Sequence, residues 1–252
     1  MKHLLRIGLL VAFALSLPFR VQSEDFIDLN NLMEIDEFLD DDGNSTNQSI
    51  ADPLESLNRT VFSFNNFIYK NVFDTFTRQY VRVVPREARK GIGNFFVNLE
   101  YPVRLTGSLL QFKFVRATKE TGKFLVNTTV GLGGFINAAK DDAVLNTPEE
   151  DIGQAIGSWG VKHGFYVVLP LLGPSSLRDF VGRLCGNAVD PLSEPWAQVK
   201  RPKDRFMLQA TDTINDLPAI LDLYNSITNS AIDPYTAVRD GYTQYRARQV
   251  EE

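Results

Sequence analysis

The sequence predicts an all-α fold, and three observations support that prediction. From residue 52 onward, apolar residues recur every three or four positions over most of the chain, which is the spacing of amphipathic helices. Asp-Pro pairs at Asp52 and Asp233 have the composition of helix starts. Only residues 166–169 have the composition of a strand, and a single strand cannot form a sheet. We therefore expect helices joined by turns.

The first expected helix begins at Asp52. Its carboxylate is expected to cap the helix, Pro53 occupies the first helical position, and Glu55 completes a capping box three residues after the cap. The helix then carries a wide apolar stripe at helical spacing, formed by Leu57, Val61, Phe64, Ile68 and Val72 and widened by Phe62, Phe67 and Phe73. A stripe this wide is either buried in protein or in contact with lipid.

Apolar spacing predicts three helices in the next part of the chain, over residues 88–99, 103–112 and 115–129. Pro85 precedes the first of these helices, and Pro102 separates it from the second. All three are amphipathic, so each is expected to bury one face against the rest of the protein.

Helix-start signals continue in the C-terminal half. The acidic run 149–151 favours the first turn of a short helix, because negative charge there complements the helix dipole. Ser175 or Ser176 is expected to cap another helix, which ends near Leu184.

Two long helical patterns close the chain. Residues 204–227 are interrupted by Pro218, which predicts two helices or one kinked helix. The last helix is expected from Asp233 to about Gln249.

The longest uncharged segment outside the N-terminus runs from Phe124 to Ala139. As a helix its 16 residues would extend about 24 Å, which is short of the roughly 30 Å of a membrane span. Its three glycines oppose a continuous helix, so we expect a helix, a break and a second short helix. It is either a buried helix pair or an apolar surface that meets lipid. The uncharged run 164–177 is equally short.

The first 23 residues resemble a secretory signal. Lys2 and Arg6 precede the apolar run 7–17, and Val21-Gln22-Ser23 suits a cleavage site, which predicts export with a chain starting at Glu24. The only cysteine is Cys185, so neither a disulfide framework nor lipid attachment next to the signal is expected.

Residues 24–50 hold nine acidic residues and no basic one, and we expect this acidic leader to be disordered. A short helix that docks a partner is the alternative. Without the signal and the leader, 23 basic and 22 acidic residues remain in residues 51–252, the expected helical domain. Nucleic acid is therefore not an expected partner, because phosphate binding requires a clear excess of positive charge.

Sequence signatures of catalysis are missing. After the signal only His163 remains, which excludes paired-histidine metal sites. No G-x-S-x-G motif occurs, and the glycines at 131, 133 and 134 lack the lysine of a phosphate-binding loop. We expect neither an enzyme nor a cofactor.

Five strings together resemble the MlaA (VacJ) family of outer-membrane phospholipid-transport proteins, and the match covers about residues 51–245. The strings are DPLESLNRTVFSFN at 52–65, NFFVNLEYPVRLTGSLLQ at 94–111, KFLVNTTVGLGGFINAA at 123–139, EDIGQAIGSWGVKHGFYVVLPLLGPSSLRD at 150–179, and DPY at 233–235. The resemblance implies a single ring-like, doughnut-shaped helical domain in the inner leaflet of the outer membrane, on its periplasmic side.

The resemblance also implies a function. Phospholipids misplaced in the outer leaflet would pass through an amphipathic channel to a periplasmic carrier of the MlaC type, which maintains lipid asymmetry without a cofactor. Trimeric porins would be partners. The alternative is a non-enzymatic interaction protein that docks to porins and handles no lipid. Candidate residues for the lipid path lie in the first helix and the glycine segment: Phe62, Phe64, Asn65, Asn127, Thr128, Gly131, Gly133, Gly134 and Phe135.

One feature departs from the family pattern. Family members usually carry a lipidated cysteine just after the signal, where this sequence has none. Retention at the membrane is therefore expected to depend on embedded apolar surface and on contact with porin.

Overall fold

The computed structural model describes residues 50–194 and 197–251. The expected signal peptide, and the acidic leader apart from Ile50, lie outside the described residues. The helices are α3 (Glu55–Ile68), the π-helix η2 (Tyr69–Phe73), α4 (Asp74–Val83), α5 (Arg86–Leu99), α6 (Tyr101–Leu110), α7 (Phe114–Thr129), α8 (Ile152–Ser158), α9 (Leu177–Asn187), α10 (Pro202–Ser230) and α11 (Pro234–Glu251). The protein is mostly helical, as predicted.

A two-stranded sheet corrects the prediction that the single candidate strand, residues 166–169, forms no sheet. The expected strand is present as β1 (Tyr166–Leu169), but it pairs antiparallel with β2 (Gly173–Ser176), in a register from Tyr166 opposite Ser176 to Leu169 opposite Gly173. The sequence of β2, Gly-Pro-Ser-Ser, has little strand propensity. Its pairing comes from the tight turn at Leu171, where φ is +67°, which returns the chain alongside β1.

The start of α3 also differs from the prediction. Asp52 does not cap the helix, which begins at Glu55 after an N-cap residue, Leu54, that makes no side-chain capping bond. Instead, the Asp52 carboxylate accepts hydrogen bonds from Asn58 Nδ2, at 2.8 Å, and from the Tyr235 hydroxyl. Asp52 therefore joins α3 to α11, a contact between residues far apart in the sequence.

Two asparagines, seven residues apart on one face of α3, attach this helix to the hairpin. Asn58 donates to the Tyr166 carbonyl at 3.0 Å and accepts from the Val168 amide at 2.9 Å. Asn65 donates to the Leu169 carbonyl at 2.9 Å and accepts from the Leu171 amide at 2.7 Å. Both side chains are almost completely buried. The inner face of α3 is therefore attached to the hairpin by polar side chains.

The main apolar core lies where the end of α3 and η2 meet α10 and α11. Its buried members are Ile68, Tyr69, Val72, Phe73, Leu217, Leu221, Leu223, Tyr224, Ile227 and Val238. A smaller cluster packs the hairpin against α11 through Ile50, Tyr166, Val168, Tyr235 and Tyr242. Phe62 packs against both clusters and bridges them.

The predicted second helix in the uncharged segment 124–139 is absent. α7 ends at Thr129, and turns follow in which Leu132, Gly133 and Gly134 have φ values of +54°, +75° and +98°. The turns are closed by hydrogen bonds from the Gly133 and Gly134 amides to the last turn of α7, each at 2.9 Å. Consecutive left-handed residues do not propagate a right-handed helix.

Most other predicted elements are present. Ser176 caps α9, and Asp151 caps α8 in a capping box with Gln154, so the acidic run precedes α8 rather than forming its first turn. α10 is one continuous helix that contains Pro218, so the two-helix alternative is wrong. The middle helices α5, α6 and α7 agree with the predicted ranges to within about two residues.

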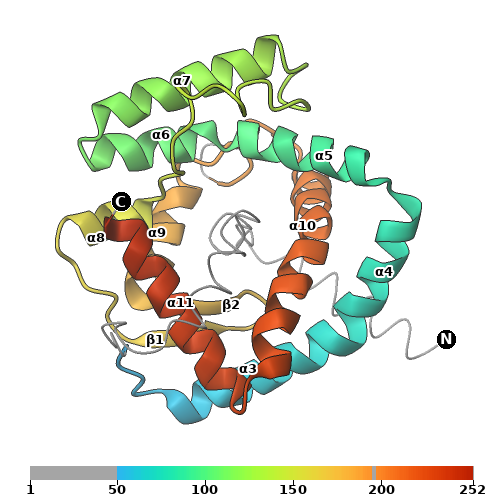
Figure 1. Cartoon of the computed structure of the whole chain (residues 1–252), viewed down its shortest axis with the longest axis vertical. Coiled ribbons are helices and arrows are strands. Elements are labelled where there is room, and N and C mark those ends of the chain that lie inside the picture. The colour runs from blue at the N-terminus through green and yellow to red at the C-terminus, as the bar shows by residue number, and fades with distance from the viewer. Residues whose placement is uncertain (1–49, 195–196, 252) are drawn as a thin grey trace.

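The elements pack against one another in an order that returns to its start (Figure 1). α3 contacts η2, η2 contacts α4, and both α4 and α5 contact α10. α5 contacts α6, which packs on α7 and α8, and α8 packs on α9. β2 contacts α9, and β1 contacts α3. α11 lies along α8, β2 and α10, so it joins distant parts of this circuit.

The attachment of α3 to the hairpin predicts a large effect for Asn58→Ala. The change removes three hydrogen bonds and leaves the Val168 amide and the Tyr166 carbonyl without that partner in the interior, so the free energy of unfolding should fall by about 3 kcal/mol. Urea unfolding followed by helical circular dichroism measures this. Thr60→Ala, at an exposed position on α3, should change it by less than about 0.5 kcal/mol. Equal losses in the two variants would contradict the proposed role of Asn58.

Candidate functional site

The predicted lipid-path residues fall in two separate places. Phe62, Phe64 and Asn65 lie on α3, and residues 127–135 lie at the end of α7 and in the turns after it. Figure 1 shows α3 and α7 on opposite sides of the molecule. The structure therefore does not gather the predicted residues into one cluster, and each group has its own surroundings.

The outward face of α3 carries large apolar side chains among small hydroxyl residues. Leu57, Phe64 and Phe67 are exposed, Leu57 by 58% and Phe67 by 60%, whereas Asn58 and Asn65 on the inner face are buried. A helix on a water-exposed surface has the opposite distribution, with apolar residues inside and polar residues outside. Further along the stripe, Ile68 and Val72 are buried in the core. The expected stripe is thus buried at one end and exposed at the other.

The glycine segment presents a second group of exposed apolar side chains. Val130, Leu132, Phe135 and Ile136 are all exposed, and so are Thr128 and Gly133, whereas Asn127, Gly131 and Gly134 are buried. The buried residues hold the turn together. Asn127 Oδ1 accepts from the Ala139 amide at 3.0 Å, and Asn98 donates to the Thr128 hydroxyl at 3.0 Å.

Two of the three glycines are required by close approach. A Cβ at Gly131 would lie 2.0 Å from the Ile136 carbonyl oxygen, and one at Gly134 would lie 2.6 Å from Asn98 Cβ. At Gly133 nothing lies within 4 Å, so there only its φ of +75° favours glycine. Phe135 stacks on Phe95 of α5, with ring centroids 5.0 Å apart, which fixes the segment against that helix.

A third exposed apolar group, which was not predicted from the sequence, lies around the turn between α6 and α7. Phe112, with φ of +58°, and Phe114 pack edge to face, and Trp159 donates to the Leu110 carbonyl at 3.0 Å. Leu109 and Val115 are exposed nearby. The pattern Phe-Lys-Phe-Val directly after a helix end is the sequence signal for this group, because its apolar residues lie where loops are usually polar.

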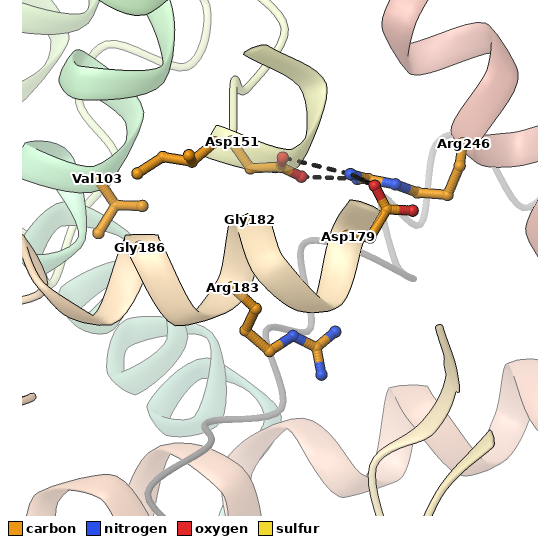
Figure 2. A pocket seen from close by; sticks show the side chains of 8 residues that line it. Val103, Asp151, Asp179, Gly182, Arg183, Gly186 and Arg246 are labelled. Carbon is orange, nitrogen blue, oxygen red and sulfur yellow. Dashed lines mark hydrogen bonds and ion pairs between the residues drawn. The ribbon is translucent and has the colours of Figure 1, made fainter. Parts of the chain in front are cut away.

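A buried charged cluster joins α8, α9 and α11 beside a small pocket (Figure 2). Arg246 donates to Asp151 Oδ2 at 2.6 Å and to Asp179 Oδ1 at 3.0 Å, and Arg178 Nε donates to Asp179 Oδ1 at 2.8 Å. Val103, Gly182 and Gly186 line the pocket together with Asp151, Asp179 and Arg246. The Arg183 side chain points away from the two carboxylates.

The charges of this cluster are balanced. Burial by itself would raise the pKa of Asp179, but the positive charges of Arg246 and Arg178 outweigh it and hold that pKa far below its ordinary value. The pKa of Asp151 is lowered as well: the charge and hydrogen bonds of Arg246 outweigh the effect of burial. Both carboxylates are therefore ionised at neutral pH, and the cluster acts as a structural joint between three helices.

A second buried carboxylate fixes the α6–α7 turn. Glu150 Oε1 accepts from Lys113 Nζ at 2.8 Å and from Arg116, and Gln111 donates to Glu150 Oε2 at 2.5 Å. On the same helices, Arg104 donates to Glu120 at 3.0 Å in a fully buried ion pair. These contacts leave the apolar side chains of the turn outside.

Within residues 50–194 and 197–251, no group of histidine, cysteine, aspartate and glutamate side chains is arranged to hold a metal ion. Nor is any helix in this part of the chain both long and apolar enough to cross a membrane.

Comparisons with known proteins place these features in context. Residues 50–249 match the sequence model of a family described as MlaA lipoprotein. The chain is 33% identical to the intermembrane phospholipid transport system lipoprotein MlaA of Escherichia coli K12, over 78% of this chain and 77% of that one. It is 30% identical to the protein of the same name in Haemophilus influenzae, over 77% of this chain and 76% of that one.

A solved structure is also similar. It is described as "Structural basis for maintenance of bacterial outer membrane lipid asymmetry", and it superposes with a TM-score of 0.64 at 29% identity. The match covers 79% of this chain and 99% of the solved chain.

The charged cluster predicts a pH dependence of stability. Because the pKa of Asp179 is lower in the folded state than its ordinary value of 3.8, its stabilisation is present above that value and is lost as the pH falls below it. The free energy of unfolding should therefore decrease from pH 6 to pH 3. Asp179→Asn should lower it by about 3 kcal/mol at pH 6 and flatten the decrease. Urea titrations at several pH values measure both quantities.

The control for this prediction is Asp222→Asn. Asp222 is an exposed carboxylate on α10, so this variant should follow the wild-type curve. A decrease between pH 6 and pH 3 that is as steep in Asp179→Asn as in the wild type would show that the cluster does not cause the pH dependence.

Proposed function

This chain belongs to the MlaA family, and from that premise we propose that it transports phospholipids at the outer membrane and so maintains the lipid asymmetry of that membrane. The observation that carries the proposal is the exposed apolar surface of α3 and the glycine segment. Each apolar segment is too short to cross a bilayer, and both are held outward by buried polar contacts. Such a surface is stable where one leaflet of a membrane covers it.

The proposed arrangement is a ring in the inner leaflet of the outer membrane. The circuit of neighbouring elements from α3 through α5, α6 and α9 back to the hairpin supports a ring. Irregular backbone at membrane depth is tolerated where it is buried in protein or lines a cavity. The backbone amides of the glycine segment bond within the segment and to the last turn of α7. The segment would therefore meet that condition as part of the wall of an amphipathic channel.

Roles within the proposed lipid path follow from burial. Leu132, Phe135 and Phe64 are exposed and would contact acyl chains, whereas the exposed Thr128 would meet head groups. Asn65 and Asn127 are buried with their side-chain amides bonded to backbone groups, so they would position the path rather than line it. Transport of this kind is passive and requires no reaction at any residue.

Two partners belong to this proposal. A soluble periplasmic carrier of the MlaC type would receive the phospholipid, and a trimeric porin would hold the protein in the membrane. The proposal also includes export of the protein by a cleaved signal peptide and its retention at the membrane through exposed apolar surface. The family resemblance supports these partners, and the exposed apolar α6–α7 turn offers surface for contact with another protein or with lipid.

The variant Leu132→Asn tests the proposal. Leu132 is 70% exposed with φ of +54°, a conformation that asparagine adopts more readily than leucine, so folding stability should be unchanged or slightly raised. Loss of the apolar side chain should nevertheless raise the amount of phospholipid in the outer leaflet severalfold toward that of cells lacking the gene. Labelling of surface-exposed phospholipid on intact cells measures this.

Val144→Asn is the matched control, because Val144 is also 70% exposed but lies outside the uncharged segment. It should restore lipid asymmetry as the wild type does. If cells lacking the gene show normal outer-leaflet phospholipid while porin assembly is altered, the protein is a porin-docking protein and the transport proposal is wrong.

A further inference from the structure

The corner between α4 and α5 concentrates exposed positive charge. We call it the basic corner and define it by Arg78, Arg82, Arg86 and Lys90, all of which are exposed. Residues 78–90 hold five basic residues and one acidic residue, Glu87, although residues 51–252 together are nearly neutral. Within the described residues, the side chains of Arg82, Arg86 and Lys90 make no hydrogen bond or ion pair, and Arg78 pairs with Asp74.

Exposed apolar side chains lie on the same helix as two of these charges. The inner face of α4 is set by buried Thr77 and by Tyr80, whose hydroxyl donates to Asn215 of α10 at 2.8 Å. Phe76 and Val83, seven residues apart and therefore on one face, are 43% and 78% exposed. The outward surface of α4 thus has an apolar strip from Phe76 to Val83 on one flank and a basic strip from Arg78 to Arg82 on the other, with the exposed Thr75 and Gln79 between them.

This combination is typical of helices that lie in a membrane interface. The apolar strip enters the layer between head groups and acyl chains, and arginine and lysine extend their long side chains to the phosphates. Anionic lipids attract basic residues near the membrane surface, and each arginine or lysine adds a roughly equal share of the attraction. The basic strip continues from α4 onto the first turns of α5 at Arg86 and Lys90, so both helices can contact one layer.

We infer that the basic corner binds the anionic head groups of the phospholipid layer in which the protein sits, with Phe76 and Val83 inserted between them. The inference rests on the proposed function in one respect, namely that a phospholipid layer surrounds the ring. It adds a preference: the protein binds negatively charged phospholipids, such as phosphatidylglycerol, more tightly than zwitterionic ones, and it takes its orientation in the layer from this corner.

The acidic leader is a competing occupant, because its nine negative charges also complement the corner. The observed surface favours lipid. Val83 is the most exposed apolar side chain of α4, and Phe67 and Phe64 near the end of α3 are exposed as well. An apolar surface that extends over two helices suits a continuous lipid layer better than a single peptide segment.

Vesicle binding tests the inference. The full chain, as processed and purified from the producing cells, is mixed at low salt with phosphatidylcholine vesicles that contain either no phosphatidylglycerol or 30 mol% of it. Flotation should show tighter binding to the anionic vesicles. The triple variant Arg82→Gln, Arg86→Gln, Lys90→Gln should lose this preference by about fivefold for each charge removed, on the order of a hundredfold in total. Binding to zwitterionic vesicles should differ little between the triple variant and the wild type.

A control variant removes the same charge elsewhere. Lys140→Gln, Arg201→Gln, Lys203→Gln changes three exposed basic residues, each next to or within three residues of an aspartate, and should keep the preference. Equal wild-type binding to the two kinds of vesicle would overturn the inference, and so would an equal loss of preference in both triple variants.

A fluorescent probe locates the contact and separates lipid from leader. In a Cys185→Ser background, Val83→Cys carries an environment-sensitive dye, and Thr211→Cys on α10 serves as the exposed control. Anionic vesicles should shift the emission of the dye at position 83 to the blue and leave that at position 211 unchanged. A shift at position 83 caused by a synthetic peptide of residues 24–50, but not by vesicles, would assign the corner to the acidic leader and overturn the inference.

The inference and the proposed function can fail separately. The purified protein could bind both kinds of vesicle equally while cells that contain it keep normal lipid asymmetry. That outcome would overturn only the inference that the basic corner binds anionic lipid. Conversely, the protein could prefer anionic vesicles while cells that lack the gene show normal outer-leaflet phospholipid. That outcome would overturn the transport function, and the inference about the basic corner would stand.

Discussion

The hydrogen bonds of Asn58 and Asn65 determine which face of α3 is buried. Each side-chain amide satisfies a backbone donor and a backbone acceptor of the β1–β2 hairpin, so the hairpin and the helix complete one another. Buried backbone groups without partners are costly, and this arrangement removes that cost only when the asparagines face inward. Leu57, Phe64 and Phe67 are then necessarily on the outside.

The same principle recurs elsewhere in the fold. Glu150 holds the basic residues of the α6–α7 turn, and Asn127 and Asn98 hold the glycine segment, while apolar side chains of both regions remain exposed. Arg246 joins Asp151 and Asp179, so α8, α9 and α11 are connected through charge. A protein that binds its elements together with buried polar contacts can expose apolar surface without losing its fold.

The combination of buried polar contacts and exposed apolar side chains fits a protein placed in a single lipid layer. The interior needs specific polar contacts, because lipid offers no alternative hydrogen-bond partners to misplaced backbone groups. The outside needs apolar side chains at the depth of the acyl chains and basic ones at the depth of the phosphates. The exposed faces of α3 and α4 together supply both, and the membership of this chain in the MlaA family gives them a setting.

Local sequence patterns determined most helices. The starts of α9 directly after Ser176 and of α11 directly after Asp233, and the extents of α5 to α7, follow from caps, prolines and apolar spacing, which act within a few residues. The family match also followed from the sequence alone. Only the tertiary structure decided that Asp52 bonds to Tyr235 instead of capping α3, that Gly-Pro-Ser-Ser forms a strand, and that part of the apolar stripe faces outward. The physical reason is that Asp52 and the inner face of α3 depend on partners more than a hundred residues away, and that β2 depends on pairing with β1 rather than on its own strand propensity. An apolar stripe by itself has the same pattern whether protein or lipid covers it.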